Sequence, residues 1–192
     1  MNKEKKIILA SASPRRQKLL MQIGVDCDVC PADIDESVLA NEKVKNYVIR
    51  LAKSKALYVK KKQRGKKIYL GADTIVVIGK EILGKPVDKN DAVRMLTQLS
   101  GSTHRVLTAV AVIGKTLNCR MSESRVTFKA LSETEIEGYW STDEPNDKAG
   151  AYAIQGKAAT FITHLEGSFS GVMGLPLYET AQMLLKENVE LS

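Results

Sequence analysis

Short apolar runs alternate along the chain with segments in which apolar residues recur every three or four positions. This alternation predicts strands and helices in turn. The run over residues 7–10 suits a buried strand, and Ser13 is a good residue to cap the start of a helix. Pro14 suits the first helical turn because its missing N–H would have no partner there. Leucines at helical spacing continue until Gly24, a typical helix terminator, so the chain begins as strand, tight turn and helix.

The same periods predict the remaining elements of the chain. They are strands over residues 26–31, 68–78, 82–83, 105–113, 117–130 and 149–154, helices over residues 42–62, 91–99, 132–140 and 177–185, and a final hairpin over residues 158–165 and 168–173. Alternating strands and helices are typical of a mixed α/β fold, here with hairpins at the sheet edges. No internal repeat and no long linker marks a boundary, which predicts a single domain over residues 1–192.

Two arginines lie in the first turn of the first predicted helix. A helix N-terminus prefers negative charge, so Arg15 and Arg16 oppose the helix dipole. Two cations beside unpaired N–H groups make sense if an anion binds between them. The pair therefore predicts a phosphate site.

Three further polar residues interrupt apolar segments or tight turns. Asp73 lies inside the apolar strand 68–78, where a carboxylate is costly unless it is paired, hydrogen-bonded or bound to metal. Lys55 falls on the buried stripe of helix 42–62, where it either snorkels past the core edge or points its ammonium into a site. Lys85 lies in a Gly-Lys-Pro turn near the same edge of the sheet. Asp73 in particular favours a functional interpretation.

Three acids follow the strand 26–31. Asp33, Asp35 and Glu36 belong either to a solvated loop or to an oxygen-ligand site for a divalent metal. The spacing alone favours the loop.

Charge and composition narrow the class of partner. The formal net charge of +7 predicts an anionic partner, which could be nucleic acid, a membrane surface or a phosphorylated small molecule. Much of the positive charge lies in residues 60–67, which a solvated loop explains. Aromatic residues make up only 5% and do not alternate with basic ones, which leaves nucleic acid without support. Neither a signal peptide nor a membrane span is recognisable, so we expect a cytoplasmic protein without membrane contact.

These residues together indicate a chemistry. Those that resist a purely structural explanation are Arg15, Arg16, Lys55, Asp73 and Lys85, with Glu36 as a second acid. Cations neutralise phosphate oxygens, carboxylates hold a divalent metal, and one carboxylate can take a proton from an attacking water. Neither a P-loop motif nor a dinucleotide-binding motif occurs. The pattern predicts a metal-dependent enzyme acting on a small phosphorylated substrate.

Several motifs, spread in order over nearly the whole chain, resemble the Maf family of nucleoside triphosphate pyrophosphatases. They are Leu9-Ala-Ser-Ala-Ser-Pro-Arg-Arg16, Gly71-Ala-Asp-Thr74, Gly84-Lys-Pro86, Leu99-Ser-Gly101 with His104, Asp147-Lys-Ala-Gly-Ala-Tyr152, Ile154-Gln-Gly156 and Val172-Met-Gly-Leu-Pro176. The resemblance implies hydrolysis between the α and β phosphates, which yields a nucleoside monophosphate and pyrophosphate. It also implies a curved mixed β-sheet with flanking helices in two lobes around a cleft, similar to the inosine-triphosphate pyrophosphatase fold.

The resemblance assigns roles to individual residues. Asp73 would be the general base, and Asp73 and Glu36 would hold the metal, Mg²⁺ or Mn²⁺. The substrate would be bound by Ser11, Ser13, Arg15, Arg16, Lys55, Lys85 and Lys148. Substrate specificity would depend on Arg15, Thr74 and Gln155, whose identities resemble the dTTP/UTP branch of the family. Of the two arginines, Arg15 would touch specificity and Arg16 would be purely electrostatic.

The resemblance also has departures and a competing interpretation. Ala153 stands where the family motif usually has Gly, and Gly171 stands where a larger polar residue is common. An alanine matters there if the backbone needs a positive φ or approaches the ligand closely. The expected role is clearance of non-standard or excess nucleotides, with CTP and modified pyrimidine triphosphates as further substrates and a homodimer as the assembly. The alternative is a basic nucleic-acid-binding protein or a regulator of septum formation.

Overall fold

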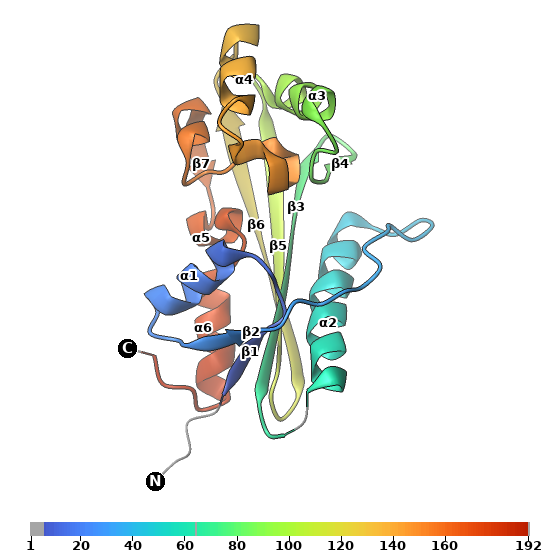
Figure 1. Cartoon of the computed structure of the whole chain (residues 1–192), viewed down its shortest axis with the longest axis vertical. Helices are drawn as coiled ribbons and strands as arrows, with labels where there is room; N and C mark the ends of the chain where they lie inside the picture. The colour runs from blue at the N-terminus through green and yellow to red at the C-terminus, as the bar shows by residue number, and fades with distance from the viewer. Residues whose placement is uncertain (1–5, 64, 192) are drawn as a thin grey trace. The chain divides into compact units, whose positions relative to one another are not determined.

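The computed structural model describes residues 6–63 and 65–191 and has the predicted α/β architecture (Figure 1). The first five residues and residue 64, which belongs to the basic segment 60–67, lie outside the described part. Seven strands form one mixed sheet in the order β2-β1-β3-β5-β6-β7, and β4 pairs with β3 as a hairpin. The chain divides into two compact units, defined by their described residues. Unit 1 comprises Met1–Asp73, Thr108–Ser122 and Gly174–Ser192, and unit 2 comprises Thr74–Leu107 and Glu123–Met173.

Unit 1 contains the predicted strand–turn–helix and the long basic helix. Its elements are β1 (Ile7–Leu9), α1 (Pro14–Gln22), β2 (Cys27–Val29), α2 (Val44–Lys62), α6 (Leu177–Lys186) and parts of the long strands β3 (Ile68–Ile78), β5 (Thr103–Ile113) and β6 (Leu117–Phe128). Strand β1 pairs in parallel with both β2 and β3, and its three residues are fully buried. Ser13 and Pro14 occupy the predicted positions at the start of α1.

Helix α2 lies along β3, and one glycine allows the two to approach (Figure 1). A Cβ added to Gly71 of β3 would lie 2.3 Å from the carbonyl oxygen of Ala52 and 2.6 Å from the amide nitrogen of Ala56. The predicted stripe of α2 packs against the sheet at this contact, with Val48, Ala52 and Ala56 fully buried. Close packing of helix against strand thus positions every side chain that α2 presents on this face.

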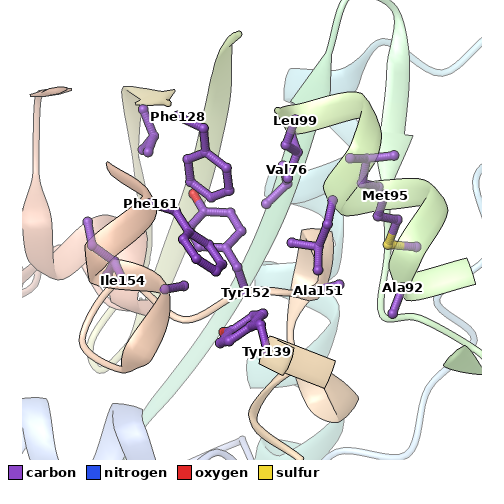
Figure 2. Close-up of a cluster of buried hydrophobic side chains, with 14 of the residues drawn as sticks. Val76, Ala92, Met95, Leu99, Phe128, Tyr139, Ala151, Tyr152, Ile154 and Phe161 are labelled. Carbon is purple, nitrogen blue, oxygen red and sulfur yellow. The ribbon is translucent and has the colours of Figure 1, made fainter. Parts of the chain in front are cut away.

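Unit 2 is built around its own apolar core. Its remaining elements are β4 (Glu81–Leu83), α3 (Lys89–Leu99), α4 (Glu133–Trp140), the 3₁₀ helices η1 (Glu144–Asp147), η2 (Ala149–Ala151) and η3 (Lys157–Phe161), β7 (Ile162–Glu166) and α5 (Phe169–Met173). The side chain of Asp88 caps α3, and Ser132 and Glu135 form a capping box at the start of α4. Figure 2 shows the rings of Phe128, Tyr152 and Phe161 gathered beside the side chains of α3.

Two predictions for the last third of the chain are wrong. Residues 149–154 form no strand, because Gly150 and Ala151 have φ angles of 70° and 58°, in the left-handed region that a strand does not use. The predicted hairpin of residues 158–165 and 168–173 is absent as well. Residues 157–161 form η3, residues 162–166 pair antiparallel with β6 instead, and residues 169–173 are helical.

None of the helices in the described ranges combines the length and the apolar character needed to cross a membrane.

Candidate functional site

The centre of the site is a lysine ammonium between two carboxylates in unit 1. Lys55 of α2 lies 2.7 Å from Oδ1 of Asp73 on β3, and its Nζ is 2.8 Å from Oε1 of Glu36. Lys55 and Asp73 are only 7% and 5% exposed, whereas Glu36 is exposed. Of the two interpretations of Lys55, the one in which its ammonium points into a polar cluster is therefore correct. The loop interpretation of the acids holds for their backbone, but Glu36 turns back towards Lys55.

Asp73 has the electrostatic character of a tunable base. Burial raises the pKa of its carboxyl group, while the charges of Lys55 and Arg16 and the hydrogen bond from Lys55 oppose that rise. Its second oxygen, Oδ2, is buried and accepts no hydrogen bond from any described residue. An unsatisfied buried acceptor is costly in a folded protein. Oδ2 is thus the atom of the cluster that is left for a proton or a ligand.

Arg16 is oriented by two hydrogen bonds from its guanidinium. Its Nε donates to the carbonyl oxygen of Gly174 over 2.8 Å, and its Nη1 donates to Oγ of Ser11 over 2.9 Å. Burial lowers the pKa of Arg16, and the charge of the neighbouring Arg15 lowers it further. The charge of Asp73 raises this pKa and so opposes both effects. The arginine is therefore electrically coupled to the cluster and also braces the chain at Gly174. The prediction that Arg16 acts only through its charge leaves out this bracing contact.

Ser11 and Ser13, which precede α1, make different hydrogen bonds. Oγ of Ser11 accepts from the backbone N–H of Ser13 over 3.2 Å as well as from Arg16. Ser13 occupies the cap position of α1, yet its side chain makes no capping hydrogen bond. The hydroxyl of Ser13 is therefore not consumed by the helix start.

Two residues that sequence reasoning missed hold Glu36 in place. The hydroxyl of Tyr47 donates to the carbonyl oxygen of Glu36 over 2.7 Å. Arg50 donates to the carbonyl oxygen of Ser37 over 2.9 Å and forms a bidentate pair with Glu42 at 2.7 and 2.8 Å. Both residues belong to α2, the helix that also carries Lys55, so one rigid element sets both partners of the ion pair. Tyr47 lies eight residues before Lys55, a same-face helical spacing visible in the sequence, whereas the five-residue spacing from Arg50 to Lys55 gave no such signal.

The other predicted site residues belong to unit 2. Thr74 follows Asp73 directly and is half-buried, while Lys85 and Gln155 are exposed. Nζ of Lys148 donates to the carbonyl oxygen of Glu144 over 3.1 Å and forms an ion pair with Asp147. The segments of the two lysines are joined, because the N–H of Gly150 donates to the carbonyl oxygen of Gly84 over 2.9 Å.

The departures from the family motif are accommodated by the backbone. Ala153 is not among the described residues with positive φ, and its N–H donates to the hydroxyl of Tyr139 over 3.1 Å. Gly171 lies buried in α5, where its N–H donates to Oγ of Ser168. The alanine therefore costs no backbone strain.

Two carboxylates of unit 1, those of Asp73 and Glu36, are the candidate ligands for a divalent cation. Within residues 6–63 and 65–191, no three His, Cys, Asp or Glu side chains are grouped so that they could enclose a metal ion. Mg²⁺ is usually held by one or two carboxylates together with phosphate oxygens and water. Oδ2 of Asp73 and the exposed carboxylate of Glu36 match that demand.

Comparison with known proteins places this geometry in a family. A sequence model described as "Maf-like protein" matches residues 6–187. A protein of Hahella chejuensis named dTTP/UTP pyrophosphatase is 49% identical over 187 residues, which covers 95% of this chain and 92% of that protein. A protein of the same name from Pseudoalteromonas translucida is 51% identical over 180 residues, covering 93% and 95%. A third, from Alkalilimnicola ehrlichii, is 50% identical over 183 residues, covering 93% and 91%.

Proposed function

The chain belongs to the Maf family, and we propose that it is a nucleoside triphosphate pyrophosphatase that hydrolyses dTTP and UTP. The observation that carries the proposal is the buried Lys55–Asp73 pair with Oδ2 of Asp73 left open. The choice of substrate comes from the names of relatives at about half identity over nearly the whole chain.

Asp73 activates the water in this proposal. Its Oδ2 accepts a proton from the water as the water oxygen bonds to one of the two phosphorus atoms that flank the oxygen bridging the α and β phosphates. The bond from that phosphorus to the bridging oxygen breaks, and the electron pair leaves with the departing phosphate group. The products are the nucleoside monophosphate and pyrophosphate. Lys55 favours the ionised form of Asp73 and so opposes the rise in pKa caused by burial, because its ammonium lies 2.7 Å from Oδ1.

The cations bind and neutralise the triphosphate. Arg16 is already oriented by Ser11 and Gly174, so little side-chain entropy is lost when it meets an anion. Arg15, Lys55, Lys85 and Lys148 supply further positive charge, and the hydroxyls of Ser11 and Ser13 supply donors. Charge that develops on phosphate oxygens during the reaction is stabilised most by such preorganised groups.

Glu36 would hold a Mg²⁺ or Mn²⁺ ion bound to the substrate. Asp73 would join it as a ligand in the alternative in which the ion lowers the pKa of the water and Asp73 only orients that water. Such an ion neutralises phosphate charge and lowers the pKa of a bound water. Tyr47 and Arg50 keep Glu36 in reach of this position through its backbone and that of Ser37. The proposal places the reaction in the cytoplasm.

The test is pyrophosphate release by the purified chain from dTTP, UTP, CTP, ATP and GTP, with Mg²⁺ or Mn²⁺. We expect dTTP and UTP to be hydrolysed fastest, with pyrophosphate and not orthophosphate as the product. The variant Asp73→Asn should lose about 100-fold or more in kcat, the usual contribution of a positioned base. The matched control is Asp33→Asn, an exposed acid of the Glu36 loop, which should keep full activity.

Two results would contradict the proposal. One is that no triphosphate is hydrolysed while duplex DNA is bound with strong salt dependence, which would favour the nucleic-acid alternative. The other is that Asp73→Asn releases pyrophosphate at the rate of the unmodified chain.

A further inference from the structure

The stretch that carries Lys148 and Gln155 has almost no regular structure of its own. It consists of the short turns η1, η2 and the start of η3, with left-handed φ at Asp143, Gly150 and Ala151. Gln155 is exposed near its end. A side chain that reads a base must be held by its surroundings within a fraction of an ångström. Because this stretch lacks the backbone hydrogen bonds of a long helix or strand, side-chain hydrogen bonds have to hold Gln155 in position.

The carboxylate of Glu144 provides it for residues 156–158. Its Oε2 accepts from the N–H of Lys157 over 3.0 Å, and its Oε1 lies 3.5 Å from the amide nitrogen of Ala158. A Cβ added to Gly156 would lie 2.2 Å from this carboxylate, so the glycine is what allows the chain to pass so close. Glu144 therefore binds the segment immediately after Gln155.

Tyr139 binds the segment immediately before Gln155. Its hydroxyl accepts from the N–H of Ala153 over 3.1 Å and donates to Oε1 of Glu144 over 2.6 Å. Tyr139 is only 3% exposed, and its ring packs edge-on against Phe161 with centroids 5.2 Å apart. Burial and the neighbouring Glu144 raise the pKa of Tyr139, so its hydroxyl keeps its proton throughout the neutral range. Figure 2 shows Tyr139 lying near Tyr152 and Ala151.

Glu144 also holds the second candidate residue of this stretch. Its carbonyl oxygen accepts from Nζ of Lys148 over 3.1 Å. One residue thus supports Gln155 through its side chain and Lys148 through its backbone. If Glu144 served only to end α4, its contacts with both Lys148 and Lys157 would have no explanation.

We propose that Tyr139 and Glu144 form a clamp that positions Gln155 and Lys148 and thereby sets the preference for the pyrimidine base. A glutamine amide carries both a donor and an acceptor, as does the edge of uracil or thymine, so its orientation decides which base it can pair. This proposal rests on the proposed function. Neither clamp residue touches the substrate in it; both are positioning residues.

The clamp is tested with the variants Tyr139→Phe and Glu144→Gln. The first removes the acceptor for Ala153. The second replaces one carboxylate oxygen by an NH2 group, so that the side chain can no longer accept both from Tyr139 and from the N–H of Lys157. We expect the ratio of kcat/KM for UTP to that for GTP to fall about tenfold, close to the loss of one well-made hydrogen bond. Tyr178→Phe and Glu133→Gln, both at exposed positions, are the matched controls and should leave the ratio unchanged.

A double variant separates positioning from mere stability. If the clamp acts through Gln155, then Tyr139→Phe combined with Gln155→Ala should show the same base preference as Gln155→Ala alone. A clamp that only stabilises the fold would lower the melting temperature and the rates for all triphosphates by one factor, with the ratio unchanged. That result, or selectivity losses that add in the double variant, would overturn the proposal.

Calorimetric binding of dTMP, UMP and GMP distinguishes failure of the clamp from failure of the proposed function. If the unmodified chain prefers UMP over GMP, the clamp variants lose that preference and no triphosphate is hydrolysed, then the function is wrong and the clamp stands. If the chain releases pyrophosphate from dTTP and UTP but the clamp variants keep full base preference, then the clamp alone is wrong.

Discussion

Replacing Lys55 by methionine leaves the Asp73 carboxylate buried without its closest cation. The ammonium lies 2.7 Å from Oδ1 of Asp73, and at an effective dielectric constant of about 20 their attraction is about 6 kcal/mol. Desolvation of both groups offsets much of that, and truncating one partner of a buried pair typically costs about 3–5 kcal/mol. Glu36, also a partner of Lys55, is exposed and can return to water at little cost.

The variant has an alternative to burying an unpaired charge, because Asp73 can bind a proton. From an ordinary aspartate pKa of about 3.9, protonation costs about 1.4 kcal/mol per pH unit, hence about 1.5 kcal/mol at pH 5 and about 4 kcal/mol at pH 7. Without Lys55 the folded-state pKa lies further above the unfolded value, so the folded state binds more protons. The unmodified chain also carries a raised pKa at Asp73, so the variant loses stability relative to it only as pH rises above that folded-state pKa, and until the higher folded-state pKa of the variant is passed.

Thermal unfolding at both pH values measures this effect. For a chain of this length, about 2–4 °C is lost per kcal/mol, so Lys55→Met should lose at most about 3–6 °C at pH 5 and at most about 8–16 °C at pH 7. Lys60→Met is the matched control, since Lys60 is an exposed lysine of the same helix and its change should cost less than about 0.5 kcal/mol. In the double variant Lys55→Met with Asp73→Asn, the difference between the two pH values should disappear. Equal losses at pH 5 and pH 7, or a pH difference that survives in the double variant, would refute the electrostatic argument.

Four further predictions concern Asp73, the two arginines and two glycines. The acid limb of the pH–kcat profile should lie above that of an ordinary aspartate, because burial raises the pKa of Asp73; a limb at or below pH 4 would contradict its role as base. Arg16→Ala should lower the melting temperature through its two lost hydrogen bonds, whereas Arg15→Ala should mainly change the rate ratio of dTTP to GTP; equal changes in that ratio would end the proposed division of roles. Gly71→Ala should lower the free energy of unfolding by about 2 kcal/mol or more and should also lower kcat. The reason is that the added Cβ would collide with the backbone of α2, and overpacking of this kind is destabilising. Gly138→Ala, in a helix with open space around the site, should stabilise by about 0.5–1 kcal/mol, and thermal melts and pyrophosphate release check both.

The sequence by itself determined the elements that begin or end at a residue with a specific local effect on the backbone, such as a proline or a capping side chain. Pro14 marks the start of α1 as predicted, and side chains next in sequence to the helices cap α3 (Asp88) and α4 (Ser132 with Glu135). The apolar run of β3 predicts its bounds because a buried strand needs apolar residues on both faces. These signals act between residues close in sequence, so the tertiary structure does not have to be known to interpret them.

The polar residues of unit 1 were also recognisable, because each carries a cost that the sequence displays. A carboxylate in the middle of β3, a lysine on the buried stripe of α2 and arginines at a helix start all need a partner or a ligand. The sequence could not decide which partner each one has. Glu36, and not Asp33 or Asp35, reaches Lys55, and Lys55 turns to the cluster instead of snorkelling.

Only the tertiary structure decided the path of the chain after Gly150. Left-handed backbone at Gly150 and Ala151 and the pairing of β7 with β6 depend on contacts between distant segments, which local periodicity does not encode. The supports of the site depend on such contacts too. In the sequence, nothing distinguishes Tyr139 and Glu144 from other polar residues. In the structure, their hydrogen bonds reach the segments on the two sides of Gln155. The sequence therefore shows which charged residues are available for phosphate chemistry. How they are oriented depends on contacts between distant segments, which only the tertiary structure shows.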